Sequence, residues 1–393
     1  MKRNALLMLL LALTLSGDTL FSTSLIWIVA GIGGSKIALG FFLCITTLIP
    51  YAAQKFSGKV NRALRTRPVQ VFSLVRTVGI GFSFLGAVLA NSITIWLVYL
   101  LGIVFMVTSY LSNQILESIM SMNVIEQKIS ANTASRLLQT AVQAGAFIGS
   151  SAAGFLLDLG GLRIICLASA LTFGIGALAL RWLDPKDGKT PYSKKSEEKN
   201  GEQRPLQASH SLLWSGLVAL IVLTMQVAAF NFLIPTIARG ERAWTARDFG
   251  LIDALAGIGA FAAVGIGKKS RIEGFWKVSF LAVGCLDVLV SQISSAPFVA
   301  GFAFLLGFFF NLLRIRQREM LYNSMRTSTE AVEWAGRITL GTMGMKALFP
   351  LLLGFVVSVI PSSMVFAAVG VFLAVILGLL QIPQFLMYQD RQG

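Results

Sequence analysis

Long apolar runs separated by short polar stretches make up almost the whole chain. A helix that crosses a bilayer needs about 20 apolar residues, and the runs reach this length repeatedly. We predict twelve spanning helices, at residues 5–30, 35–56, 68–91, 93–122, 132–157, 161–183, 211–237, 247–267, 275–292, 296–322, 331–358 and 362–388. Because these helices occupy nearly all of the chain, they leave no room for a sizeable soluble domain.

Two stretches need separate interpretation. The start, Met1-Lys2-Arg3 before an apolar run, resembles a signal peptide, but the run passes signal-peptide length without a small-residue cleavage site, so we interpret it as the first spanning helix. Residues 184–210 are too polar to form a core and are predicted to be a flexible, cytoplasmic linker. The predicted domains are therefore a six-helix bundle over residues 1–183 and a second one over residues 211–393.

Composition agrees with this pattern. The chain has 393 residues, of which 55% are hydrophobic and 13% charged, whereas a soluble protein is about one quarter charged. Its formal net charge of +15 is concentrated in short loops, which favours contact with anionic lipid over nucleic acid. The three cysteines lie within apolar segments without ligand spacing, so we expect packing roles and no metal or cofactor.

The distribution of basic residues predicts the orientation. If the N-terminus is cytoplasmic, the loops that follow even-numbered helices are cytoplasmic too, and these loops hold most of the Lys and Arg. The opposite side receives only Lys36, Arg163, Arg239, Arg242 and Arg247. By the positive-inside rule, both termini are cytoplasmic. We therefore expect a multi-pass protein of the cell inner (plasma) membrane. We also expect it to be a monomer.

The two halves of the chain read as copies. Ala134-Ser135-Arg136 opens the fifth predicted helix and Ala335-Gly336-Arg337 opens the eleventh. The same offset pairs three positions of the fourth and tenth helices, and each set lies on one face of its helix. The paired positions are Tyr110 with Asn311, Asn113 with Arg314, and Glu117 with Arg318. A parallel repeat of six helices is a known transporter construction.

Two short motifs accompany this repeat. The loop from Gly58 to Arg67 is similar to the G-x-L-A-D-R-x-G-R-R motif of the major facilitator superfamily, although Arg62 replaces its acidic residue. The stretch Gly145 to Gly154 is similar to the antiporter motif G-x-x-x-G-P-x-x-G-G, with Ser150 in place of proline. The chain thus resembles this superfamily over its full length, and loosely its small bacterial siderophore and drug exporters. The resemblance implies two pseudo-symmetric six-helix bundles, with helices one, four, seven and ten lining a central cavity.

Charges inside the membrane are costly and therefore indicate function or interhelical pairing. We predict that Asp18 and Glu117 carry a coupling proton, because a buried carboxylate can load and release protons near neutral pH. Substrate-binding roles are predicted for Tyr110, Asn113, Arg314, Asn311, Lys346 and Arg76. Gating or structural roles are predicted for Arg136, Arg337, Asp253 and Asp287.

The sequence predicts an all-α secondary transporter that works by alternating access. Buried bases equal or outnumber buried acids, and arginine binds carboxylates bidentately. This favours proton-coupled export of a small anionic or zwitterionic molecule, such as a carboxylate siderophore. A multidrug/proton antiporter and uptake of a small anion remain alternatives, as does a membrane enzyme or lipid scramblase. Against an enzyme, the sequence has no Ser/His/Asp set, HExxH or P-loop.

Overall fold

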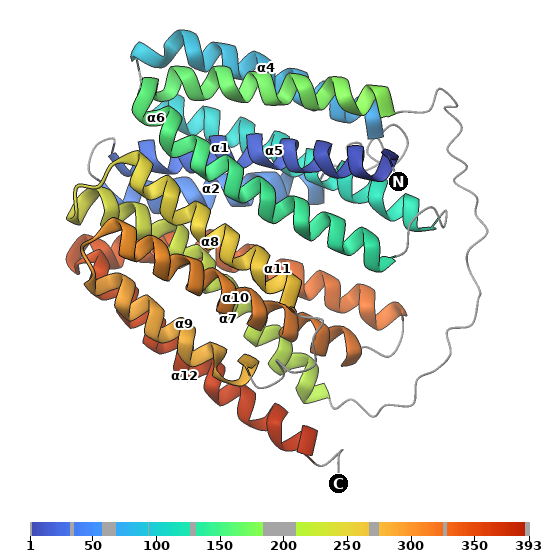
Figure 1. Cartoon of the computed structure of the whole chain (residues 1–393), viewed down its shortest axis with the longest axis vertical. Coiled ribbons are helices and arrows are strands. Elements are labelled where there is room, and N and C mark those ends of the chain that lie inside the picture. The colour runs from blue at the N-terminus through green and yellow to red at the C-terminus, as the bar shows by residue number, and fades with distance from the viewer. Residues whose placement is uncertain are drawn as a thin grey trace.

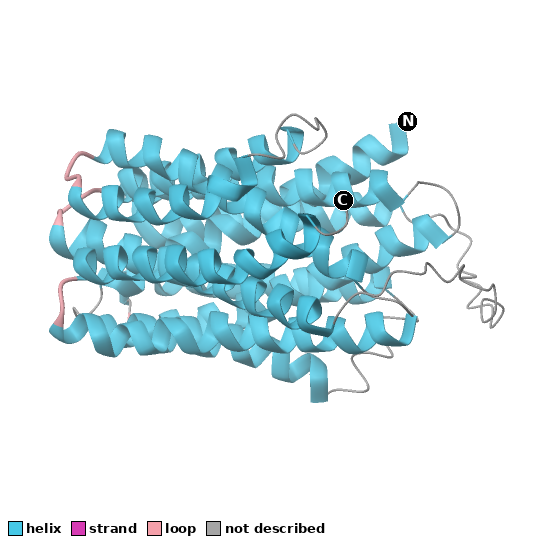
Figure 2. Ribbon diagram, turned by 90° about the horizontal axis from the view of Figure 1, so that it is seen from below, coloured by secondary structure: helices cyan, strands magenta, loops and turns pink. Residues whose placement is uncertain are grey.

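The protein is a bundle of long helices. A computed structural model describes residues 2–31, 35–56, 68–92, 94–125, 131–183, 210–266, 275–324 and 328–389, and all of the regular structure in these ranges is helical (Figure 2). Only helices and closed barrels satisfy every backbone hydrogen bond within lipid. The predicted all-α membrane fold is confirmed.

The described residues of the first half form five helical elements and one short turn. They are α1 (Lys2–Gly31), α2 (Lys36–Phe56), α4 (Pro68–Val88), the 3₁₀ turn η1 (Leu89–Ser92), α5 (Ile95–Ile125) and α6 (Ala131–Leu183). Helix α6 is two spans joined by a turn at Gly160 and Gly161. Gly161 has a φ of 59°, a conformation in which any other residue is strained, so glycine places the boundary between the fifth and sixth spans here.

The second half repeats the arrangement. It consists of α7 (His210–Thr236), a π-helical turn η2 (Ile237–Glu241), α8 (Ala246–Ile266), α9 (Phe275–Gln292), α10 (Ala296–Ser324), α11 (Ser328–Val359) and α12 (Ser362–Gln389). With α6 divided at its turn, the described residues form the twelve predicted helices, in two halves of six. The predicted linker lies outside the described residues except for His210, so the domain boundaries stay a prediction.

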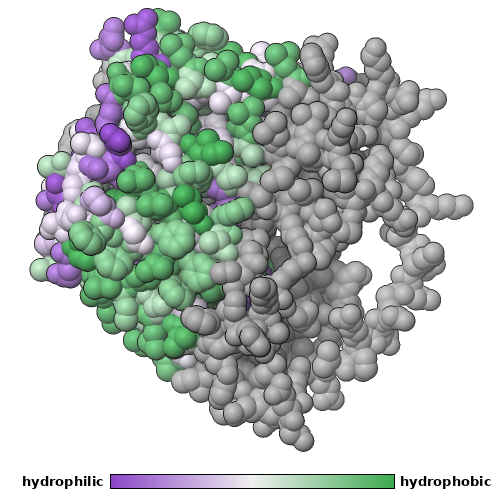
Figure 3. Space-filling view, viewed as in Figure 1, coloured by the Kyte–Doolittle hydropathy of each residue, from purple (hydrophilic) through white to green (hydrophobic). Residues whose placement is uncertain are grey.

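The helices run side by side, and the two halves occupy opposite sides of the molecule in Figure 1. Within the part of the chain that the structure describes, eight helical segments are long and apolar enough to cross a membrane, among them Leu213–Glu241 and Ser362–Leu380. Apolar side chains cover the described part of the face in Figure 3, and the hydrophilic ones gather at the end where the helices turn. This distribution suits an outer surface that faces lipid, with polar groups near the membrane boundary.

The two halves meet mainly through two pairs of helices, α6 with α8 and α2 with α11. At the first pair, a Cβ on Gly154 would lie 3.0 Å from the Cα of Gly250, and a Cβ on Gly250 would lie 2.9 Å from the Cα of Gly154. Such an approach requires small residues on both helices. Glycine therefore lets the backbones of the two halves touch near the ends of these helices.

Candidate functional site

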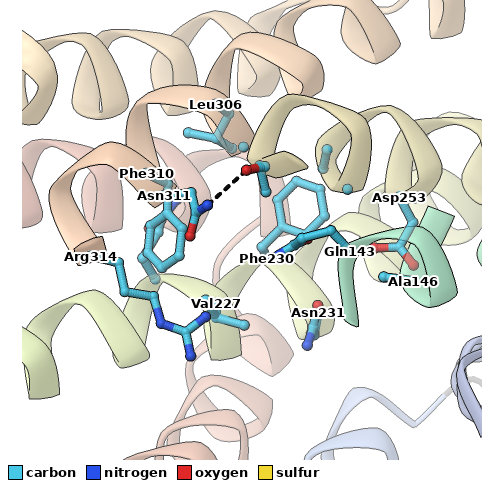
Figure 4. A pocket seen from close by; sticks show the side chains of 15 residues that line it. Gln143, Ala146, Val227, Phe230, Asn231, Asp253, Leu306, Phe310, Asn311 and Arg314 are labelled. Carbon is cyan, nitrogen blue, oxygen red and sulfur yellow. Dashed lines mark hydrogen bonds between the residues drawn. The ribbon is translucent and has the colours of Figure 1, made fainter. Parts of the chain in front are cut away.

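A cavity lies between the two halves, bounded by α6, α7, α8 and α10 (Figure 4). Its volume is about 180 Å³. The residues that line it are Gln143, Ala146, Gln226, Val227, Phe230, Asn231, Asp253, Ala256, Gly257, Ala260, Leu306, Gly307, Phe310, Asn311 and Arg314. Apolar surface with a few polar groups is the usual lining of a small-molecule site.

The charges of the cavity are separated. Figure 4 shows Arg314 at one side and Asp253 at the other, with the rings of Phe230 and Phe310 between them. Asn311 donates from Nδ2 to the carbonyl oxygen of Ala260 at 2.7 Å, which fixes the orientation of its amide. A ligand spanning this cavity would meet a cation at one end and a carboxylate at the other.

Lys346 extends the positive side of the site. This α11 side chain is exposed and lies close enough to Arg314 and Arg318 for electrostatic repulsion among the three cations. Lys346 is not among the residues that line the described cavity. Three neighbouring cations within a membrane protein are stabilised by an anion, so this cluster marks the side of the cavity at which a carboxylate or another anionic group would bind.

Asp253 joins the two halves. From α8 it accepts hydrogen bonds from the hydroxyl of Ser150 on α6 at 2.5 Å and from that of Thr23 on α1 at 3.3 Å. The two hydroxyls are themselves 3.4 Å apart. An ionised acceptor makes such bonds stronger than those between neutral groups. Asp253 is therefore both a wall of the cavity and a contact that must break if the halves separate here.

Further contacts close the same end of the molecule. Lys36 Nζ donates to the carbonyl oxygen of Val357 at 2.9 Å, and Arg239 Nη1 donates to that of Trp27 at 2.8 Å. The Trp27 ring also stacks on Phe249 with centroids 5.4 Å apart. In Figure 1 the ribbons of the two halves lie closer together at this end than at the end that carries the chain termini. The described conformation is thus closed at the end formed by these residues.

Asp18 and Arg76 form a buried ion pair outside the described cavity. Arg76 Nη1 and Nη2 donate to Asp18 Oδ1 and Oδ2 at 2.8 and 3.2 Å, and the two side chains are 1% and 7% exposed. The guanidinium is also packed against the rings of Phe72 and Phe173, at 5.3 and 4.6 Å from their centroids. Neither residue lines the cavity. The pair joins α1 to α4, and the predicted roles of Asp18 in proton coupling and of Arg76 in substrate binding stay predictions.

Other predicted residues are distributed as follows. Tyr110 and Asn113 lie on α5, which contributes nothing to the described cavity lining. The side chains of Glu117 and Arg136 lie outside the described residues, so their roles stay predictions. Arg337 is packed on the rings of Trp214 and Trp334, at 5.5 and 4.9 Å from their centroids, which fits a structural role. Of the predicted substrate-binding residues, Asn311 and Arg314 line the cavity.

Asp287 is fully buried on α9. Both of its oxygens accept from Nε2 of Gln226, each at 2.7 Å. Gln226 belongs to α7 and lines the cavity. Asp287 was predicted to have a gating or structural role, whereas Gln226 was not predicted as a site residue. The signal in the sequence was a polar amide, Gln226 or Asn231, within the apolar helix α7, which was expected to line the cavity.

Comparisons with known proteins agree with this architecture. The sequence profile described as Major Facilitator Superfamily matches residues 7–324. A comparison with curated protein sequences finds no matching relative.

Solved transporters share the fold at low sequence identity. A bacterial homologue of the iron transporter ferroportin, in an inward-facing state, matches with a TM-score of 0.69 and 15% identity over 97% of this chain and 99% of that one. The nucleoside transporter NupG matches with a TM-score of 0.68 and 13% identity over 97% and 100%. A bacterial homologue of the lysosomal transporter Spinster, inward-facing and unoccupied, matches with a TM-score of 0.66 and 12% identity over 96% and 95%.

The profile match over most of the chain, together with the two six-helix halves around a central cavity, establishes the class of protein. It is a multi-pass membrane transporter and not an enzyme. The chain belongs to the Major Facilitator Superfamily.

Proposed function

We propose that this transporter exports a small polar anionic or zwitterionic molecule in exchange for protons. The observation that carries the proposal is the separation of charge in the cavity, with Arg314 at one side and Asp253 at the other (Figure 4). Arg314 would bind a carboxylate of the substrate bidentately. A donor group of a zwitterion, such as an ammonium, would lie toward Asp253.

The size and charge of the cavity narrow the substrate class. A volume of about 180 Å³ is below the roughly 300–1,000 Å³ of sites for drug-sized ligands. The cavity therefore favours a small metabolite over a large carboxylate siderophore. The cations Arg314, Arg318 and Lys346 disfavour a lipophilic cation, which is the substrate expected of the multidrug alternative. The solved structures of similar fold include a nucleoside transporter and a bacterial homologue of an iron transporter, so the fold itself does not select a substrate.

In this proposal, orientation determines which side of the membrane the cavity faces. The basic loops favour cytoplasmic termini, which would make the closed end extracytoplasmic and the described conformation inward-facing. Two solved relatives of similar fold are themselves described as inward-facing. A substrate from the cytoplasm would enter such a conformation, and breaking the bonds of Asp253 to Ser150 and Thr23 would open the other end.

Transport in proteoliposomes tests the proposal. Radiolabelled glutamate serves as a zwitterion with an extra carboxylate, citrate as a polycarboxylate, and ethidium as a lipophilic cation. We expect glutamate or citrate, and not ethidium, to move against a proton gradient and to stop when a protonophore collapses it. Flux in the direction of the protons would instead support the uptake alternative, and ethidium flux alone would support the multidrug alternative.

Variants of Arg314 connect this flux to the site. Arg314→Lys keeps the charge but loses the bidentate fork, so it should raise the concentration of carboxylate needed for half-maximal flux by about tenfold or more. The matched control is Arg316→Lys, because Arg316 lies on the same helix but does not line the cavity. Normal transport by both Arg314→Lys and Arg314→Ala, in a folded protein, would refute the anionic-substrate proposal.

A further inference from the structure

Asp287 is a buried carboxylate that the proposed transport cycle does not yet use. Its exposed fraction is 0%, and within the described part of the chain its hydrogen bonds come from the single Nε2 of Gln226. Ionised carboxylates in protein interiors are ordinarily paired with a cation or with several donors, because an isolated charge costs much free energy there. One neutral amide is an unusually small set of partners for a charged aspartate.

The helices around Asp287 supply no compensating charge. Helix α12 packs on α9, and a Cβ on its Gly370 would lie 3.0 Å from Oδ2 of Asp287. No ionisable side chain, including cysteine and tyrosine, occurs in residues 362–380 of α12, 213–236 of α7 or 296–313 of α10. Arg242 reaches the end of α9, but its Nη2 donates to the carbonyl oxygens of Val290 and Ser291 at 2.9 and 2.6 Å. The side chain of Lys277 on α9 lies outside the described residues.

The hydrogen bonding of Gln226 depends on whether Asp287 holds a proton. In the described arrangement Nε2 donates to both oxygens of Asp287, and the buried Oε1 of Gln226 has no hydrogen-bond partner among the described residues. A protonated Asp287 has a hydroxyl that can donate to Oε1 while its other oxygen accepts from Nε2. A small rotation of the amide thus satisfies both groups in the neutral state, whereas the ionised state leaves Oε1 available.

The first half of the chain provides a comparison. There the first and third helices, α1 and α4, are joined by Asp18 and Arg76. In the second half the first and third helices, α7 and α9, are joined by Gln226 and Asp287. The repeat has therefore placed a complete ion pair at one of these positions and an acid with an amide at the other. In the second arrangement, protonation of the acid leaves no unpaired buried charge.

We propose that Asp287 is a proton-binding site of this transporter and that Gln226 connects its protonation to the cavity. The inference deepens the proposed function and rests on its proton coupling. When Asp287 is protonated, it hydrogen-bonds with both Oε1 and Nε2 of the Gln226 amide. When the proton leaves to water in the cavity, Oε1 is free to accept from a donor group of the substrate. Proton and substrate then exclude each other, which is the relation that exchange requires.

Infrared spectroscopy of the purified full-length protein tests the site without any substrate. A buried protonated aspartate gives a carboxylic acid C=O band that shifts in D₂O and, in protein labelled with ¹³C-aspartate, shifts again. We expect such a band to be present at acid pH and to disappear as the pH is raised. Asp287→Asn should remove it, and Asp253→Asn, the control acid of the cavity, should leave the Asp287 component in place.

Gln226→Leu tests the connection and does not depend on the folding of Asp287→Asn. The ionised form loses its single donor, so the loss of the band should move to higher pH by about one unit or more. Met225→Leu is the matched control on the same helix. An aspartate band that does not respond to Gln226→Leu, or that persists in folded Asp287→Asn, overturns the proposal. Absence of proton-driven flux for every probe would count against the proposed function alone, because the band is measured without transport.

If exchange occurs with one of the probes, Asp287→Asn separates coupling from binding. The variant should lose accumulation driven by the proton gradient but retain exchange of labelled for unlabelled probe across the membrane. Arg314→Ala should instead reduce both activities. Undiminished gradient-driven accumulation by Asp287→Asn would exclude Asp287 as a coupling site.

Discussion

Replacing Asp18 by Asn tests whether the buried pair with Arg76 is structural. The change keeps the shape of the side chain and removes the charge that Arg76 contacts through two hydrogen bonds of 2.8 and 3.2 Å. Arg76 is 1% exposed and its Nε already has no partner among the described residues, so water cannot replace the lost carboxylate. Removing one partner of a buried pair costs about 3–5 kcal/mol, which for a chain of this size corresponds to a fall in Tm of roughly 4–6 °C.

Thermal unfolding of the detergent-solubilised protein, followed by size-exclusion chromatography after heating, measures this fall. The double variant Asp18→Leu, Arg76→Met replaces both charges by apolar groups and should recover most of the loss, as apolar replacements of buried pairs commonly do. It should also retain proton-driven transport. The reasoning is refuted if Asp18→Asn is as stable as the wild type while the double variant no longer couples transport to protons, since Asp18 would then carry the proton itself.

Three further outcomes are expected. Ser150→Ala removes the shortest bond to Asp253, and the loss of about 1.5–3 kcal/mol should raise the outward-open population roughly tenfold or more, measured by spin-label distances across the closed end. Gly161→Ala forces a side chain into a backbone conformation (φ 59°, ψ −151°) that is essentially restricted to glycine, so it should lower stability by about 1–3 kcal/mol, whereas Gly81→Ala, with open space around its Cβ, serves as the control. A cysteine substituted at Ser196 should react with an impermeant reagent in intact cells much more slowly than one at Gly240, and equal rates would contradict the predicted orientation.

The helices were predictable because lipid imposes one constraint on every segment. A spanning helix must be long, apolar and internally hydrogen-bonded, so its limits can be read from runs of side chains without knowing their partners. The predicted span 275–292, for example, agrees with the bounds of α9. The turn between the two spans of α6 was predictable from Gly160 and Gly161, because two adjacent glycines between apolar runs are a turn signal.

The cavity was less predictable than the helices. Hydropathy indicates how deep in the membrane a polar residue lies, but it does not indicate which residues of other helices that residue contacts. Asp18 and Asp253 look alike in the sequence, as single acids in apolar helices. Asp18 is bound by Arg76 of its own half, whereas Asp253 contacts Ser150 of the other half and lines the cavity. This difference depends on the direction in which each helix face points, which is set by packing between helices. Gln226 and Asn231 line the cavity, but they were not predicted because they carry no charge and hydropathy does not show which way their side chains point.

The two halves share a fold but differ in how they can respond to protons. In the first half, Asp18 is the counter-charge of the buried guanidinium of Arg76, so this position holds a complete ion pair. Protonating Asp287 leaves no buried charge there and supplies a hydroxyl that can donate to Oε1 of Gln226, so the second half tolerates the change. Asp253, whose bonds hold the halves together at the closed end, also belongs to the second half. A proton gradient would therefore act on the half that carries both the titrating acid and the contact that must break, while the first half serves as the rigid surface against which it moves.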